Sequence, residues 1–194
     1  LGLAIFLITL IPFFIGVKNG TVLTRWQSVS VFKWEAKENI AKKIEEMVEK
    51  AKESIAEIIK QKGEEAAYEA GVFNLDPRIL LILGRLHFRS SYGQNVLQHS
   101  VEMAHIAGML AEELGADPVV ARAGALLHDI CKAVDHEVTG THVEIGKRIL
   151  EKFGADQAVV KAMQAHHEEY PYETLESRIV QAADGISGGR PGAR

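Results

Sequence analysis

The sequence predicts an all-α protein. Apolar residues recur at helical spacing, and no stretch alternates with period two for long enough to predict a strand. Asp76–Pro77 and Asp117–Pro118 each place an N-cap acid before a proline at the first helical position. Gly115 and Gly154 fit helix ends. We therefore expect consecutive helices from Asp76 onward.

The composition is that of a globular protein with one domain, or one domain plus an appendage: 194 residues, 47% hydrophobic and 25% charged. The net charge of -4 excludes a global positive field that would attract nucleic acid, so any such contact is local. The single cysteine, Cys131, excludes a disulfide framework and favours a reducing compartment.

Residues 1–17 carry no charge and predict an apolar N-terminal helix. At about 1.5 Å per residue the segment would span roughly 26 Å, just short of the ~30 Å hydrocarbon core. The first charges after it, Lys18, Arg25 and Lys33, are basic and favour a cytoplasmic C-terminal side. We expect a single-pass anchor in the cell membrane. A signal remnant, a buried helix and a sequence-assembly accident are the alternatives.

Residues 18–34 show no clear period, and we interpret them as a linker. Residues 35–75 predict a long amphipathic helix, in which apolar residues recur three or four positions apart. These residues are Ile40, Ile44, Met47, Ala51, Ile55 and Ile58. The stripe fits a coiled-coil or domain-linking stalk equally as well as a solvated helix lying on the next domain.

Histidines and aspartates recur on the predicted helices of residues 76–194, among apolar neighbours. His128 and Asp129 are adjacent, and adjacent helical residues diverge by about 100°, so both reach one ion only near the end of a buried helix. His142 begins a helix capped by Thr141 and Glu144. The full set is His99, His128, Asp129, His142, His166, His167 and Asp184.

We interpret these histidines and aspartates together as the ligands of a metal centre. A carboxylate such as that of Asp184 on an apolar helix face is costly to bury unless it is paired or bound to a cation. A lone buried histidine is more often a hydrogen-bonded core residue, and an isolated His-Asp pair is close to chance. Imidazole and carboxylate together suit Zn, Mn, Fe or Mg, and helical bundles commonly build such sites in their cores.

The order His, His-Asp, His, His-His, Asp resembles the HD superfamily of metal-dependent phosphohydrolases. Within it the chain is similar to the ribonuclease Y family of membrane-anchored bacterial endoribonucleases. The resemblance covers roughly residues 36–194 and is carried by GRLHFRSSYGQNVLQHSVEMAHIAGMLAEELG, AGALLHDICKAVDHEVTGTHVEIG and AADGISGGRPGAR. It implies an HD-domain helical bundle at residues 76–194.

The resemblance also implies two sets of ligands: His99, His128, Asp129 and Asp184 for a first divalent ion, and His142, His166 and His167 for a second, with Asp129 between them. His128, Asp129 and Lys132 would be the catalytic residues, with Lys132 contacting a phosphate. The implied substrate is single-stranded RNA, hydrolysed to initiate mRNA decay. The implied partners are a second copy of the chain and other RNA-decay proteins.

A basic and aromatic run could guide RNA by charge and stacking, or form a solvated helix face with a few core aromatics. It comprises Arg78, Arg85, His87, Phe88, Arg89 and Tyr92.

The sequence departs from the family at three points. Cys131 replaces the usual glycine, no RNA-binding KH domain is found, and the family's chain continues past the segment that ends at Arg194. We therefore expect a C-terminally incomplete HD domain. An HD phosphohydrolase of small cyclic dinucleotides and a non-catalytic membrane-tethered fragment are the alternative functions.

Overall fold

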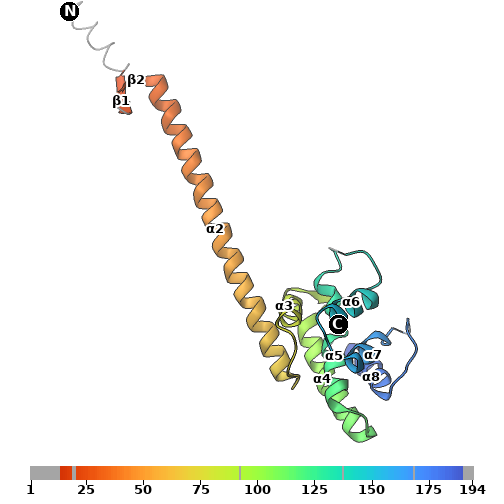
Figure 1. Ribbon diagram of the computed structural model, residues 1–194. Coiled ribbons are helices and arrows are strands. Elements are labelled where there is room, and N and C mark those ends of the chain that lie inside the picture. Colours follow the sequence, from red (N-terminus) through yellow and green to blue (C-terminus); the bar gives the residue numbers. More distant parts are fainter. Residues whose placement is uncertain (1–13, 19–20, 92, 137, 168, 190–194) are drawn as a thin grey trace, which may run out of the picture. The chain divides into compact units, whose positions relative to one another are not determined.

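The computed structural model describes residues 14–18, 21–91, 93–136, 138–167 and 169–189, with side chains described from Lys37 (Figure 1). This part of the chain is mainly helical, which confirms the all-α prediction. The helices are α2 (Arg25–Glu69), α3 (Pro77–Arg85), α4 (Val96–Leu114), α5 (Pro118–Leu127), α6 (His142–Lys152), α7 (Gln157–Gln164) and α8 (Leu175–Gly189), with short 3-10 turns at Leu86–Phe88 and Ile130–Ala133. The chain forms two compact units, residues 1–54 and 55–194.

The first unit contains an antiparallel hairpin of β1 (Phe14–Lys18) and β2 (Thr21–Thr24), with Val17 opposite Val22. The final residues of the predicted apolar helix are therefore a strand, and residues 1–13 of that segment lie outside the described residues. The local sequence favours a hairpin, because Asn19-Gly20 separates two runs rich in β-branched and aromatic residues. Within the described part of the chain, no helix is long and apolar enough to cross a membrane.

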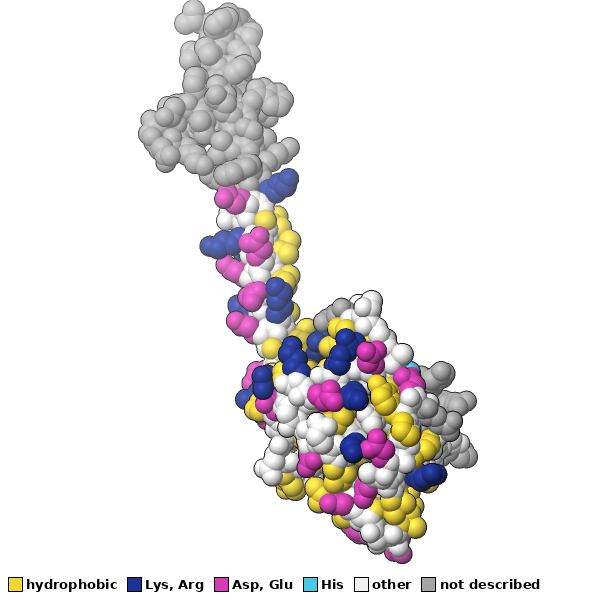
Figure 2. Space-filling view, turned by 45° about the vertical axis from the view of Figure 1, so that its right-hand side comes forward, with side chains coloured by type: hydrophobic (Ala, Val, Ile, Leu, Met, Phe, Trp, Pro, Cys, Tyr) yellow, Lys and Arg dark blue, Asp and Glu magenta, His cyan; other side chains and the backbone are white. Residues whose placement is uncertain are grey.

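Helix α2 begins at Arg25, within residues 18–34, the segment that the sequence predicts as a linker. No proline or glycine lies between Thr21 and Lys62, and each residue added to an existing helix gains a backbone hydrogen bond. From Lys37 to Ser54 the described side chains are exposed. Figure 2 shows apolar side chains along one edge of this helix and charged side chains along another, as the amphipathic pattern predicts.

The second unit begins within α2, ahead of the domain start predicted at Asp76, because the end of α2 is part of the core. Ala66, Ala67 and Ala70 are buried there. Gly63 of α2 approaches Gly84 of α3 so closely that a β-carbon on Gly63 would lie 2.0 Å from the Leu80 carbonyl oxygen. Helix α4 packs against α5 and α8, and α5 also packs against α7 and α8. Their apolar faces form one core, which includes Leu83, Met103, Leu126, Leu127, Met163 and Val180.

The predicted helix boundaries in this unit are confirmed. Asp76 accepts a hydrogen bond from the backbone N–H of Arg78, and Asp117 caps α5 in the same way. Thr141 accepts from the backbone N–H of Glu144 at the start of α6. Gly115 ends α4 with φ of 72°, a conformation that glycine adopts without strain.

A candidate metal centre between helices α4, α5, α7 and α8

The predicted histidines lie side by side, although they come from different helices. Ring centroids are 5.2 Å apart for His99 and His128, and 5.3 Å apart for His128 and His166. His167 continues the row at 4.2 Å from His166, and His142 lies 4.7 Å from His167. The fold therefore brings all five predicted histidines into one continuous cluster.

His128 and Asp129 reach this cluster because α5 ends directly before them, at Leu127. The chain leaves the helix there and enters a 3-10 turn at Ile130. Both side chains are buried, with Nε2 of His128 3.2 Å from Oδ2 of Asp129. The sequence predicts this position at the end of a buried helix, because only there can two adjacent side chains reach one ion.

The cluster contains two groups whose ligand atoms all lie within 4.8 Å of one another. One group is His99, His128 and Asp184, and the other is His142, His166 and His167. Asp129 belongs to neither group, although its contact with His128 places it beside the first. Imidazole nitrogens with a carboxylate form a donor set that divalent transition metals favour.

Two of the buried rings are oriented by backbone carbonyls. Nδ1 of His128 lies 2.8 Å from the Ala125 carbonyl oxygen, and Nδ1 of His166 lies 2.6 Å from that of Met163. A carbonyl only accepts, so Nδ1 carries a proton in each ring. In His166, whose pKa burial lowers to about 3, Nε2 carries the lone pair. Nε2 of His166 is buried without a hydrogen-bond partner among the described residues. A buried nitrogen lone pair without a hydrogen-bond partner is suited to ligate a metal ion.

Burial and charge shift the pKa values of these rings. Burial, with the nearby His128, lowers the pKa of His166 to about 3, so this ring is neutral at physiological pH. Burial, with His142, also lowers the pKa of His167. Burial acts to lower the pKa of His128 as well, but the adjacent Asp129 carboxylate outweighs it and the pKa is raised. Neutral imidazole is the form that ligates metals, and the lowered pKa values of His166 and His167 favour it.

The two aspartates remain ionised despite burial. Burial alone would raise the pKa of Asp129, but His128 and Lys132 hold it well below its usual range. For Asp184 the hydrogen bond with His99 and the nearby His128 outweigh burial and lower the pKa. Both groups thus offer negative charge to a cation.

Lys132 pairs with Asp129 rather than pointing into solvent. Its Nζ lies 2.6 Å from Asp129 Oδ2 and 3.4 Å from Ser91 Oγ. Arg89 fixes the same turn, since its Nε donates to the Lys132 carbonyl oxygen at 2.7 Å and its guanidinium pairs with Asp135. The ammonium group is therefore held at the entrance of the cluster.

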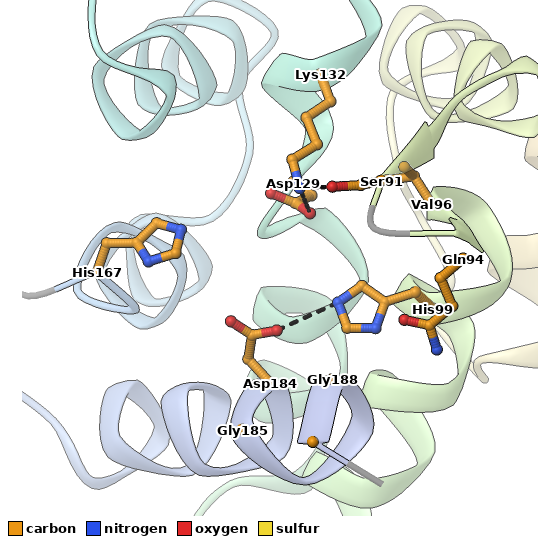
Figure 3. A pocket seen from close by; sticks show the side chains of 11 residues that line it. Ser91, Gln94, Val96, His99, Asp129, Lys132, His167, Asp184, Gly185 and Gly188 are labelled. Atoms are coloured by element: carbon orange, nitrogen blue, oxygen red, sulfur yellow. Dashed lines mark hydrogen bonds and ion pairs between the residues drawn. The ribbon is translucent and has the colours of Figure 1, made fainter. Parts of the chain in front are cut away.

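A cavity of about 340 Å³ opens onto these groups (Figure 3). Sequence reasoning missed one of its walls, where Ser91 and Gln94 come from a small antiparallel pair, β3 (Ser90–Ser91) and β4 (Gln94–Asn95). These strands are too short for a periodic signal. The other lining residues are Val96, His99, Asp129, Lys132, His167, Asp184, Gly185, Gly188 and Gly189.

Cys131 is fully buried next to this site and packs in the core side of the turn. Burial, with the neighbouring Asp129 carboxylate, raises the pKa of its thiol to about 12. The side chain is thus a neutral thiol at physiological pH and behaves as a small apolar group.

Comparison with known protein families identifies this helical unit. The HD domain family model matches residues 96–189, which include every residue of the histidine and aspartate cluster. Residues 96–189 are an HD domain. The HD domain carries the paired His128 and Asp129 at the end of α5, and the family implies a divalent metal in such a domain.

Curated relatives share more than the domain. The chain is 54% identical over 152 residues to ribonuclease Y of Alkaliphilus metalliredigens, which covers 78% of this chain and 32% of that protein. It is 55% identical over 152 residues to ribonuclease Y of Thermoanaerobacter pseudethanolicus and of Thermus thermophilus, with 78% of this chain covered and 30% and 26% of theirs. The chain thus spans about a third or less of their length. No solved structure matches it significantly.

Proposed function

We propose that this chain is a metal-dependent phosphodiesterase that hydrolyses RNA. The observation that carries the proposal is the pair of ligand groups, in which the buried Nε2 of His166 has no hydrogen-bond partner among the described residues. His99, His128, Asp129 and Asp184 would hold one divalent ion, and His142, His166 and His167 a second. Mn, Mg, Zn and Fe all suit this donor set.

A divalent ion in such a site activates water at neutral pH and offsets charge on phosphoryl oxygens. The residues of the chain would supply the rest. Lys132, held at the entrance by Asp129 and Ser91, would bind a non-bridging phosphate oxygen and stabilise its charge in the transition state. Asp129 would orient both His128 and Lys132, since it contacts each of them.

The substrate proposal follows from the relatives, which are named ribonuclease Y. We infer single-stranded RNA, because the scissile phosphate must reach a buried cluster and unpaired chains can do so. In a cell this activity would initiate mRNA decay. A homodimer and RNA-decay proteins are the proposed partners.

We further propose that residues 1–17 attach the chain to the cell membrane as a single-pass anchor, with the HD domain on the cytoplasmic side. Their lack of charge and the basic residues that follow support this proposal.

The test uses the full 194-residue chain. Bound metal is measured, and cleavage of a 5′-labelled single-stranded RNA is compared with cleavage of a cyclic dinucleotide. We expect metal and RNA cleavage in the parent, and neither in the His128→Ala/Asp129→Ala variant. The His105→Ala/Glu113→Ala variant, on the exposed surface of α4, is the matched control.

Absence of bound metal, or equal rates in parent and site variant, would refute the catalytic proposal. A higher rate on the dinucleotide would replace RNA as the substrate.

A further inference from the structure

His99 is oriented differently from the other buried rings of the cluster. Its Nδ1 lies 2.9 Å from the hydroxyl oxygen of Ser187 in α8. That hydroxyl donates in turn to Oε2 of Glu102, at 3.1 Å. Ser187 is completely buried, so this contact is shielded from water. Three side chains thus form a relay from the surface of α4 to the proposed ligand.

The direction of each hydrogen bond in this relay is determined. A carboxylate only accepts, so the single proton of the Ser187 hydroxyl is directed to Glu102. The Ser187 oxygen can then only accept from His99. Nδ1 of His99 must therefore carry a proton, which leaves Nε2 as the ring atom able to bind a metal ion. Nε2 is the atom that faces Asp184, at 3.2 Å.

The position of His99 explains why side chains are needed here. His128 and His166 follow the ends of α5 and α7, where nearby carbonyl oxygens are available to accept from Nδ1. His99 lies inside α4, where backbone carbonyls are engaged in helical hydrogen bonds. A hydroxyl alone would not fix the tautomer, because it donates as readily as it accepts. The carboxylate of Glu102 removes that ambiguity.

We propose that Glu102, acting through Ser187, is a positioning residue that holds His99 in the tautomer able to bind a metal ion. This inference rests on the proposed metal centre and adds residues that touch neither metal nor substrate. Partners of this kind typically change metal affinity by about 10- to 100-fold when they are removed.

The experiment compares the parent with Glu102→Gln, Ser187→Ala and the control Glu113→Gln, an identical change on the exposed surface of α4. Long-range ¹H–¹⁵N spectra of the metal-free full-length chains report which ring nitrogen of His99 carries the proton. Titration with Mn²⁺, followed by calorimetry, reports metal affinity. Thermal unfolding followed by circular dichroism shows whether each variant is folded.

We expect Nδ1 of His99 to carry a proton in the parent and in Glu113→Gln. Glu102→Gln can donate from its amide to Ser187, which frees the hydroxyl to donate to His99. Both relay variants should therefore populate the Nε2-protonated ring and bind Mn²⁺ about 10- to 100-fold more weakly.

A lowered melting temperature with unchanged tautomer and unchanged affinity would mean a merely structural contact, and would overturn the proposal. If the parent binds Mn²⁺ and loses affinity in the variants but does not cleave RNA, the relay stands and the proposed function fails. If the parent binds no Mn²⁺, Mn²⁺ is not the metal of this centre, and an unchanged tautomer in the variants would then overturn the relay.

Discussion

The Nε2 atom of His99 lies 3.2 Å from Oδ1 of Asp184, across the packed helices α4 and α8. A nitrogen lone pair that faces a carboxylate is unfavourable unless a proton or another cation lies between them. This contact therefore makes the site sensitive to the charge of residue 184.

Substitution of Asp184 by Asn preserves its shape and removes its charge. We expect Asp184→Asn to lower metal affinity by at least about 10-fold, because a charged ligand is replaced by a weaker neutral one. The measurement is metal content after dialysis. Asp156→Asn is the control, since asparagine also caps a helix at that position of α7. Equal metal content in both variants would contradict the prediction.

Lys132 provides a test of the phosphate contact. Lys132→Gln should lower kcat for RNA by about 100- to 1,000-fold, the effect typical of removing one donor to transition-state charge. The substitution should leave bound metal nearly unchanged, because Lys132 belongs to neither ligand group. Lys43→Gln, on the exposed part of α2, serves as the control. A kcat equal to that of the parent would exclude the role proposed for Lys132.

The close contact of α2 and α3 predicts that a glycine-to-alanine substitution destabilises the protein at Gly84 and stabilises it at Gly188. A β-carbon at Gly84 would lie 1.8 Å from the Ile59 carbonyl oxygen, so Gly84→Ala forces the helices apart. We expect a loss of about 1–3 kcal/mol or more in the free energy of unfolding. At Gly188 of α8 a β-carbon would meet nothing within 4 Å, so Gly188→Ala should stabilise by up to about 1 kcal/mol. Urea unfolding measures the free energy of unfolding of both variants. Equal values for Gly84→Ala and Gly188→Ala would show that α2 and α3 are not in close contact.

Cys131 should be chemically inert in the folded protein. Its thiol is buried and its pKa is raised to about 12, so the reactive thiolate is scarce. Iodoacetamide should modify it at least about 100-fold more slowly in native protein than in urea, as mass spectrometry would record. Rapid labelling of the native chain would mean that the turn after Asp129 opens readily.

Asp76 predicts a dependence of stability on pH. The hydrogen bonds from Arg78 lower the pKa of Asp76 from 3.8 to about 2 in the folded protein. Its ionised form therefore stabilises the fold above about pH 3.8, and this contribution is lost as the pH falls towards 2. Asp76→Asn keeps the cap but loses the ion pair, so it should unfold more easily than the parent at neutral pH. The difference should vanish in acid. A stability difference between parent and variant that stays constant from neutral pH to acid would show that the Asp76 ion pair does not cause it.

Much of the fold follows from local signals. Asp-Pro pairs begin helices and glycines end them through contacts with a few neighbouring residues, so these helix boundaries can be predicted from the sequence. The histidines and aspartates were predictable as a set, because most of them lie on apolar helix faces where a polar group needs a partner, although His142 and His167 are exposed. Their proposed role as ligands is an inference from chemistry and resemblance.

The remainder depends on contacts between distant segments. Nothing near Ser187 in the sequence indicates His99, and a single serine in a helix is usually unremarkable. The close approach at Gly63 and Gly84 is equally non-local, since helix-interior glycines have many causes. The hairpin of β1 and β2 was missed because a run of apolar residues suits a helix and a strand alike.

The burial of Ala66, Ala67 and Ala70 has a consequence for how this domain can be recombined. A gene fusion that joined a foreign sequence at Asp76 would discard a wall of the core and uncover α3. A breakpoint that keeps the domain intact must fall upstream of Gly63, within the helix itself. Module exchange among proteins of this kind would therefore carry the last turns of α2 along with the HD domain.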